Sequence, residues 1–232
     1  MRPAPNDPRA DLEQLCARGL SWSNDLTRNL PDSTRGRPAA VLVLFGVLDS
    51  VPATRADRGE RASSPTARVP RDLDVLLVRR AETLGSHPGQ IGFPGGRLEA
   101  ADADATAGAL REAIEETGVD PSGVDTLGAL PELSLTASNH LVTPVLAWWT
   151  RPSEVVAVDH AETIEVFRVP VADLLDPANR SITVHGGVYR MPAFTVGDRL
   201  IWGFTAHVLS RLFEELGWAV PWDSGRIVQP DR

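Results

Sequence analysis

Apolar and polar positions along the chain repeat with the two periods that distinguish strands from helices. Runs rich in Val, Leu and Ile predict strands at residues 39–48, 74–80, 124–135, 141–150 and 163–169. Residues 181–195 predict a β-hairpin that turns at Gly186 and Gly187. Helical spacing predicts helices at residues 11–20, 106–117, 171–175 and 199–216. Because strands and helices alternate without regular βαβ spacing, we expect an α/β fold with a mixed β-sheet and helices on both faces.

The same pattern predicts one large domain with short additions at both ends. The chain has 232 residues, and residues 39–217 carry most of the strand and helix signals. Residues 1–38 form an N-terminal extension with a short helix, and residues 218–232 form a C-terminal tail. Residues 49–71 contain Arg, Ser, Pro, Asp and Glu with few apolar residues, which predicts a flexible loop within the domain.

Composition and charge narrow the class of partner. The net charge is −8, which argues against binding to nucleic acid, and no apolar run is long enough to span a membrane. Every basic residue is arginine, so a phosphate must be bound by arginine, a backbone N–H group or a metal ion. Cys16 is the one cysteine, so an internal disulfide is impossible and we expect a cytoplasmic protein. The sequence leaves a homodimer open.

Three glutamates in the helix predicted at residues 106–117 indicate a cation site. Glu112, Glu115 and Glu116 are spaced i, i+3 and i+4, which places three carboxylates on one face near the helix C-terminus. Their mutual repulsion and the helix dipole both disfavour this arrangement, and a bound Mg²⁺ or Mn²⁺ would relieve it. Arg111 can pair with one carboxylate and hold it for the metal. The alternative is a solvated acidic face of a surface helix.

The remaining positions of this helix have structural interpretations. Leu110, Ile114 and Thr117 share a different face, which we expect to pack on the core. Asp102 and Asp104 precede the helix and are expected to cap its N-terminus.

A glycine turn precedes the acidic helix. Phe93 and Pro94 lead into Gly95 and Gly96, a pattern typical of a sharp turn. Without side chains, the two glycines allow the backbone to approach a phosphate or a metal ion closely. We therefore expect the turn and the acidic helix to form one site.

Together these segments resemble the Nudix box, G-x5-E-x7-R-E-U-x-E-E-x-G-U, in which U is a bulky apolar residue. Residues 111–119 read REAIEETGV, and Gly96 supplies the first glycine. Two positions and one spacing depart from the box. Ala113 is small for a U position, Asp102 replaces the first glutamate, and the segment from Gly96 to Arg111 is one residue longer.

The longer spacing is similar to the coenzyme A pyrophosphatase branch of the Nudix family. That branch carries FPGG-x-x-[DE]-x-x-D-x-D followed by ALRE, which residues 93–112 match. Its upstream motif, L-L-T-x-R-[SA]-x3-R-x3-G-x3-F-P-G-G, resembles residues 76–96 at unchanged spacing, with Val78 in place of threonine and Gly85 in place of the second arginine. The resemblance extends over roughly residues 39–217.

The resemblance implies a Nudix-type α/β/α sandwich and a metal-dependent hydrolase of pyrophosphate bonds. It implies that Mg²⁺ or Mn²⁺ is bound by the three glutamates, with Arg111 as a further catalytic residue. Coenzyme A would be cleaved to 3′,5′-ADP and 4′-phosphopantetheine. The residues expected to contact the substrate are Arg80, His87, Gly95 and Gly96.

Several roles stay open on the sequence alone. The general base is either Glu116 or an acid from a distant loop such as Glu162. His87 is either a substrate contact or an ordinary loop histidine. Trp148, Trp149 and Trp202 either stack on adenine or belong to the core.

Two competing functions also remain. The first is a Nudix hydrolase of another nucleoside diphosphate derivative, such as ADP-ribose. The second is a non-catalytic Nudix-like sensor of a ligand. The three intact glutamates favour an enzyme over a sensor.

Overall fold

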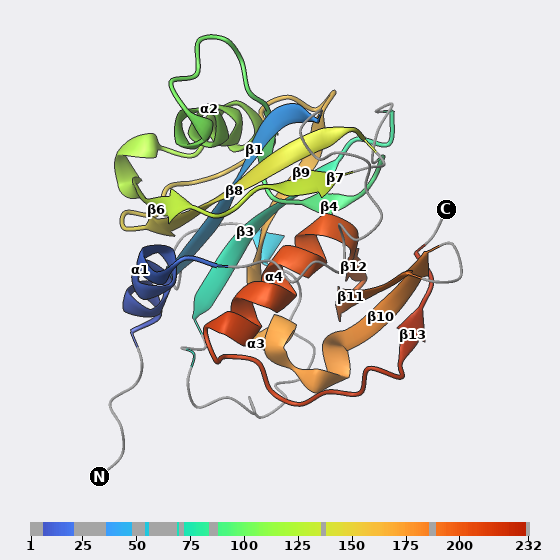
Figure 1. Ribbon diagram of the computed structural model, residues 1–232. Helices are drawn as coiled ribbons and strands as arrows, with labels where there is room; N and C mark the ends of the chain where they lie inside the picture. Colours follow the sequence, from blue (N-terminus) through green and yellow to red (C-terminus); the bar gives the residue numbers. More distant parts are fainter. Residues whose placement is uncertain are drawn as a thin grey trace.

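The computed structural model describes residues 7–20, 36–47, 54–55, 69, 72–83, 88–135, 138–185 and 189–230 (Figure 1). Most of the loop predicted at residues 49–71 and the hairpin turn predicted at Gly186 and Gly187 lie outside these ranges. None of the described helices has both the length and the apolar character needed to cross a bilayer.

A mixed β-sheet of nine strands forms the centre of the protein, as the sequence predicts. Its main path runs β2-β9-β3-β1-β8-β6, with β1 parallel to β8 and antiparallel to β3. The strands are β1 (Arg37–Val47), β2 (Thr54–Arg55), β3 (Leu73–Arg80), β4 (Ile91–Gly92), β5 (Gly95–Arg97), β6 (Val124–Ala129), β7 (Leu133–Leu135), β8 (His140–Trp149) and β9 (Thr163–Pro170). The prediction of one strand over residues 124–135 was wrong, because residues 130–132 separate β6 from β7.

The central sheet divides at the end where β3 finishes. There β1 pairs with β3 only through Phe45–Val47, and the two strands then take different partners. The start of β1 pairs with β5, which aligns Ala40 with Gly96, and the end of β3 pairs with β4, which aligns Val78 with Gly92. The prediction of a sharp turn was therefore wrong for Gly95 and Gly96, which belong to β5 and pair with β1, whereas residues 93–94 connect β4 to β5. The name glycine turn is kept for residues 93–96, which lie between two central strands.

Helices cover both faces of this sheet (Figure 1). Alternate residues of each strand point to opposite faces, so β1 sends Leu42 and Leu44 to one core and Val43 and Phe45 to the other. The first core packs against α2 (Ala105–Thr117). The second packs against α1 (Pro8–Arg18), α3 (Val171–Leu175) and α4 (Gly203–Glu215). This arrangement gives the α/β/α layers that the sequence predicts.

Helix α2 lies against the sheet through small side chains. Ala109 and Ala113 are fully buried, whereas Leu110 and Ile114 are only partly buried at the edge of the core. Leu110 and Ile114 pack against this core and Thr117 is buried, as expected, but the alanines make the deepest contact with the sheet. Because a methyl group takes little space, the alanines allow the helix axis to approach β1 closely.

A second sheet of four strands follows the central one along the chain. It contains β10 (Arg180–His185), β11 (Tyr189–Val196), β12 (Arg199–Ile201) and β13 (Ile227–Val228), in the order β12-β11-β10-β13. The helix predicted at residues 199–216 was wrong at its start. Gly197 has a φ of 61°, which turns the chain so that Arg199–Ile201 pairs with β11, and α4 begins at Gly203.

The segment after α4 is packed against the N-terminal helix. Trp218 is fully buried, lies edge-on to Phe45 and stacks on Phe213. Its indole N–H donates a hydrogen bond of 2.9 Å to the Asp11 carboxylate of α1. One tryptophan thus joins α1, the central sheet and α4 on the face opposite α2.

We expect Trp218→Ala to lower the free energy of unfolding by about 3–5 kcal/mol, because it opens a cavity and leaves Asp11 without its donor. Urea denaturation followed by circular dichroism measures this loss. Val156→Ala is the control, since Val156 is 55% exposed and its truncation removes little packing. A loss below about 1 kcal/mol for Trp218→Ala would contradict the central packing role of this residue.

Candidate active site

The acidic helix α2 starts and ends with ordinary caps. The Asp104 carboxylate accepts a hydrogen bond of 2.8 Å from the Ala107 N–H, which confirms Asp104 as the N-cap. Gly118 ends the helix with a φ of 65°, the left-handed conformation that glycine adopts most readily. Asp102 does not cap the helix as expected, because its carboxylate is directed to Arg111.

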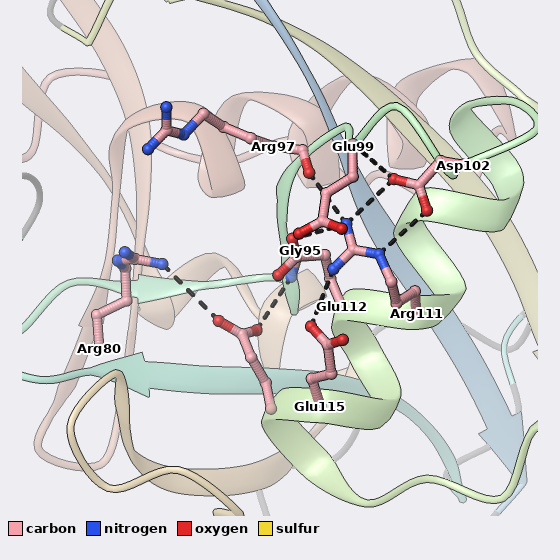
Figure 2. A network of polar contacts seen from close by, with 9 residues as sticks. Arg80, Gly95, Arg97, Glu99, Asp102, Arg111, Glu112 and Glu115 are labelled. Carbon is pink, nitrogen blue, oxygen red and sulfur yellow. Dashed lines mark hydrogen bonds and ion pairs between the residues drawn. The ribbon is translucent and has the colours of Figure 1, made fainter.

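Arg111 is the centre of a polar network between β5 and α2 (Figure 2). Its Nε and Nη2 atoms donate to the two Asp102 oxygens at 3.0 and 3.1 Å, and Nη2 also donates to the Arg97 carbonyl at 3.1 Å. Nη1 pairs with Glu115 at 2.9 Å, and Nη2 lies 3.1 Å from Glu112. Hydrogen bonds from Arg111 hold the pKa of Asp102 below its ordinary value. This network links the β5 backbone to α2.

Glu116 is the most deeply buried carboxylate of the site, with 3% of the residue exposed. One oxygen accepts a hydrogen bond of 3.0 Å from the Gly95 N–H, and the other lies 3.9 Å from Nη1 of Arg80. Burial raises the pKa of Glu116 to about 7, although the Gly95 N–H and the Arg80 charge both oppose the rise. The negative charge of Glu112 raises this pKa further.

Glu112 lies against the second glycine of the turn. Burial raises its pKa, and the ion pair with Arg111 limits that rise. A Cβ atom on Gly96 would lie 2.5 Å from the Glu112 carboxylate, and one on Gly95 would lie 2.4 Å from the Ala40 carbonyl oxygen. A side chain at Gly95 would therefore collide with the β1 backbone, whereas a side chain at Gly96 would displace only the Glu112 carboxylate.

Two of the three predicted glutamates are suited to hold a divalent cation. Glu112 and Glu116 supply hard oxygen atoms, and a cation would offset the cost of ionising two neighbouring carboxylates away from water. Glu115 differs, because its side chain is 58% exposed and paired with Arg111. Over the described ranges, no three His, Cys, Asp or Glu residues form a group able to hold a metal ion. Mg²⁺ sites commonly use one or two carboxylates together with substrate phosphates, which this pair fits.

The two arginines at the end of β3 point in different directions. Arg80 faces Glu116, whereas Arg79 pairs with Glu165 on β9, with 3.3 Å between the charged atoms. Glu165 also pairs with Arg199 of β12 at 2.5 Å, so this second network joins the two sheets. Only Arg80 lies beside the acidic helix, in line with the alternation of strand side chains.

Glu162 approaches the site from the turn before β9. Its carbonyl accepts a hydrogen bond of 2.8 Å from the Ala81 N–H, and its own N–H donates to the Asp159 carbonyl at 3.1 Å. The charge of Glu162 raises the pKa of both Glu112 and Glu116, so the three carboxylates repel one another across the site.

The other sequence candidates divide into two groups. His87 and Gly85 lie outside the described residues. Trp149 is buried in the core beside α2, as expected of a structural tryptophan, and Trp148 packs against the opposite core. Arg97 was not a candidate on the sequence, although it directly follows the two glycines and its exposed side chain lies in this region (Figure 2).

Comparison with known proteins identifies the family of this chain. The NUDIX domain family matches residues 65–186, which is more than half of the chain. The chain is 33% identical to the uncharacterized Nudix hydrolase NudL of Photorhabdus laumondii over 145 residues, covering 61% of this chain and 76% of that protein. It is 33% identical to NudL of Escherichia coli over 156 residues, covering 66% and 80%.

A solved structure of an Ap4A hydrolase from C. elegans, in a binary complex, is similar at 18% identity and a TM-score of 0.42, covering 59% of this chain and 83% of that one. The family match and the relatives show that this chain belongs to the Nudix family. It is a Nudix hydrolase, an enzyme that acts on phosphoric anhydride bonds.

The two glycines of the turn are expected to respond differently to substitution by alanine. Gly95→Ala should lower the free energy of unfolding by more than about 2 kcal/mol, because the new methyl group meets the β1 backbone. Gly96→Ala should leave stability nearly unchanged, because the flexible Glu112 side chain can move aside, but it should weaken Mn²⁺ binding.

Urea denaturation and calorimetric titration of Mn²⁺ measure the two effects. Gly92→Ala is the matched control, since its Cβ would meet only the Thr205 hydroxyl at an ordinary 3.8 Å. Equal destabilisation by the Gly95 and Gly96 substitutions would contradict this division of roles.

The raised pKa of Glu116 predicts a pH dependence of stability in metal-free protein. Between the ordinary glutamate value near 4.5 and about 7, the folded state keeps a proton that the unfolded state has lost. The free energy of unfolding should therefore fall as pH rises through this window, by on the order of 3 kcal/mol for this group. Glu116→Gln should remove that decline while still accepting the Gly95 hydrogen bond.

Urea denaturation from pH 4.5 to 8 in the presence of a chelator measures the difference between wild type and variant. Glu115→Gln serves as the exposed control and should leave the wild-type slope intact. A Glu116→Gln profile parallel to that of the wild type would show that Glu116 ionises normally in the folded protein.

Proposed function

We propose that this Nudix hydrolase is a metal-dependent pyrophosphohydrolase of coenzyme A or its derivatives, with 3′,5′-ADP and 4′-phosphopantetheine as products. The observation that carries the proposal is the placement of Glu112 and Glu116 beside the glycine turn. The substrate assignment rests on residues 76–96, which resemble the upstream motif of the coenzyme A pyrophosphatase branch. The proposed chemistry thus rests on the structure, whereas the proposed substrate rests on the sequence.

The acidic pair fits a divalent metal ion, and Nudix hydrolases generally use such ions. We propose Mg²⁺ or Mn²⁺, held by Glu112 and Glu116, with Glu115 as a third ligand once its side chain leaves Arg111. When bound, the ion would neutralise diphosphate charge and lower the pKa of a water molecule. Asp102 keeps Arg111 in place through two hydrogen bonds, so the acidic helix keeps its position on β5.

The protein itself supplies positioning around the diphosphate. Gly95 and Gly96 leave the backbone open to a phosphate group, since neither carries a side chain. Arg80 lies beside Glu116 and brings a guanidinium group that can bind a phosphate oxygen. A preorganised arrangement of this kind lowers the barrier by orienting substrate and water before the reaction.

We assign the role of general base to Glu162. Both oxygens of Glu116 already have neighbours, the Gly95 N–H and Arg80. Glu162 is exposed and is held close to the acidic pair by the backbone hydrogen bond to Ala81. Its carboxylate can therefore accept the proton of the attacking water from the open side of the site.

Product analysis by chromatography and mass spectrometry tests the substrate. Separate samples of coenzyme A, ADP-ribose, NADH, diadenosine polyphosphates and dGTP are incubated with the protein and Mg²⁺ or Mn²⁺. We expect the fastest metal-dependent reaction to be the release of 3′,5′-ADP and 4′-phosphopantetheine. Faster cleavage of ADP-ribose or another compound would show that coenzyme A is not the preferred substrate. The proposed hydrolysis of a pyrophosphate bond would still stand. No turnover of any sample would favour a ligand sensor.

Two variants separate the proposed roles of the carboxylates. Glu116→Gln should weaken Mn²⁺ binding in calorimetry and abolish turnover. Glu162→Gln should lower kcat by at least ~10²-fold, the range expected for loss of a general base, while Mn²⁺ binding stays at the wild-type value. Loss of Mn²⁺ binding in Glu162→Gln would instead identify Glu162 as a metal ligand.

A further inference from the structure

The chain segment that leads into β9 is attached by its backbone to the end of the acidic helix. The Val156 N–H donates a hydrogen bond of 3.0 Å to the Thr117 carbonyl, and the Val158 N–H donates one of 3.2 Å to the Glu116 carbonyl. Both acceptors lie in the last turn of α2, where carbonyl groups have no partner within the helix. The two valine side chains are each 55% exposed, so hydrogen bonds rather than packing make the attachment. The segment therefore keeps a fixed position relative to Glu116.

Asp159 folds the residues after this attachment into a tight turn. Its carboxylate accepts a hydrogen bond of 2.8 Å from the Ala161 N–H. Its carbonyl accepts hydrogen bonds from the N–H groups of Glu162 at 3.1 Å and Thr163 at 2.8 Å. Aspartate favours such a turn because its short side chain reaches the N–H group two residues further along the chain. Three consecutive N–H groups are thus bound by Asp159, and that of Glu162 is one of them.

The start of β9 fixes the other end of the turn. The pairing of β9 with β3 shifts by one residue there, so that Ile164 is an extra residue between two paired ones. Bulges of this kind redirect a strand and are frequent beside active sites. Thr163, which precedes the bulge, is fully buried and pairs with Arg80. The Glu162 carbonyl accepts the Ala81 N–H at 2.8 Å, so the backbone of Glu162 is held on both sides while its side chain is exposed.

The charges near Glu162 favour its movement away from the site. Its carboxylate raises the pKa of both Glu112 and Glu116, and it is therefore repelled by them when all three are charged. A loose segment would reduce this repulsion by moving Glu162 outward into water. The hydrogen bonds of the turn oppose that movement, and the one from Ala161 ends on a side chain rather than on the backbone. The carboxylate of Asp159 is thus the part of the turn that a substitution can remove.

Resting on the proposed role of Glu162 as general base, we infer that Asp159 is a positioning residue for the reaction, whose carboxylate locks the turn that keeps Glu162 beside the acidic pair. Asp159 binds the backbone N–H of Ala161, so it contributes an acceptor oxygen and not a charge. Without this contact the turn opens more often. Glu162 is then in place to accept the proton of the attacking water for a smaller fraction of the time.

Steady-state kinetics on the full chain, with the compound that the wild type cleaves fastest, tests the inference. Asp159→Ala should lower kcat about tenfold at an unchanged KM, a size typical of a lost hydrogen bond to a charged acceptor. Mn²⁺ binding in calorimetry should stay at the wild-type value. Asp159→Asn should restore most of kcat, because the amide oxygen still accepts the Ala161 N–H.

Asp176→Ala is the matched control. The Asp176 carboxylate accepts a hydrogen bond of the same length, 2.8 Å, from the N–H of Ala178, two residues further along the chain. That turn leads into β10 of the second sheet and not into β9, so kcat should stay at the wild-type value. Urea denaturation should show a similar small loss of stability in both alanine variants, which separates the loss of kcat from unfolding.

A double variant separates positioning from a purely structural role. If Asp159 acts through Glu162, the variant that combines Asp159→Ala with Glu162→Gln should have the kcat of Glu162→Gln alone. Losses that multiply would overturn the inference, since Asp159 would then act independently of Glu162. An unchanged kcat in Asp159→Ala, or an equal loss in Asp159→Asn, would overturn it as well.

Glu162→Gln distinguishes failure of this inference from failure of the proposed function. If that variant loses kcat and Asp159→Ala does not, Glu162 stays the general base and Asp159 has no part in positioning it. If Glu162→Gln keeps the wild-type kcat, the assignment of the general base fails, and the inference about Asp159 fails with it.

Discussion

The hydrogen bond from the Gly95 N–H to Glu116 is the contact on which the site depends. It joins the glycine turn, inserted between two central strands, to the helix that carries the acidic residues. The carboxylate accepts this bond away from water, which is why its pKa rises although both of its close partners favour the charged form. The fold therefore holds an acidic group in a position that is unfavourable without a positive ligand, and such positions are typical of functional sites.

A second constraint acts through Arg111. Without a fixed guanidinium, Glu112, Glu115 and Asp102 would repel one another at the start of the site. The two hydrogen bonds to Asp102 and the contact with the Arg97 carbonyl hold the arginine from three sides. The acidic helix is thereby tied to β5, the strand that contains Gly95 and Gly96.

Much of this arrangement could be predicted from the sequence, because it depends on local pattern. The acidic helix, its Asp104 cap and the central strands follow from periodicity and capping rules. The proximity of the two glycines to the acidic helix was expected, but their pairing with β1 as part of β5 was not. The features that depend on contacts between distant segments of the chain could not be predicted. Strand β12, at residues 199–201, forms because it pairs with β11. Asp102 pairs with Arg111, nine residues away, and this contact prevents it from capping the helix as expected. The burial of Glu116 could not be predicted either, because its neighbour Glu115 is the same residue type in the same helix and is exposed.

The alanine face of α2 has a consequence for how the chemistry of this enzyme can be altered. Ala109 and Ala113 set the height of the helix above the sheet, and that height decides how far the acidic groups stand from the glycine turn. The spacing of the acidic groups from the glycines is thus set by apolar residues that are fully buried in the core. A larger side chain at either position would act as a spacer between the layers, and it would move Glu112 and Glu116 away from Gly95 and Gly96 without changing any polar residue.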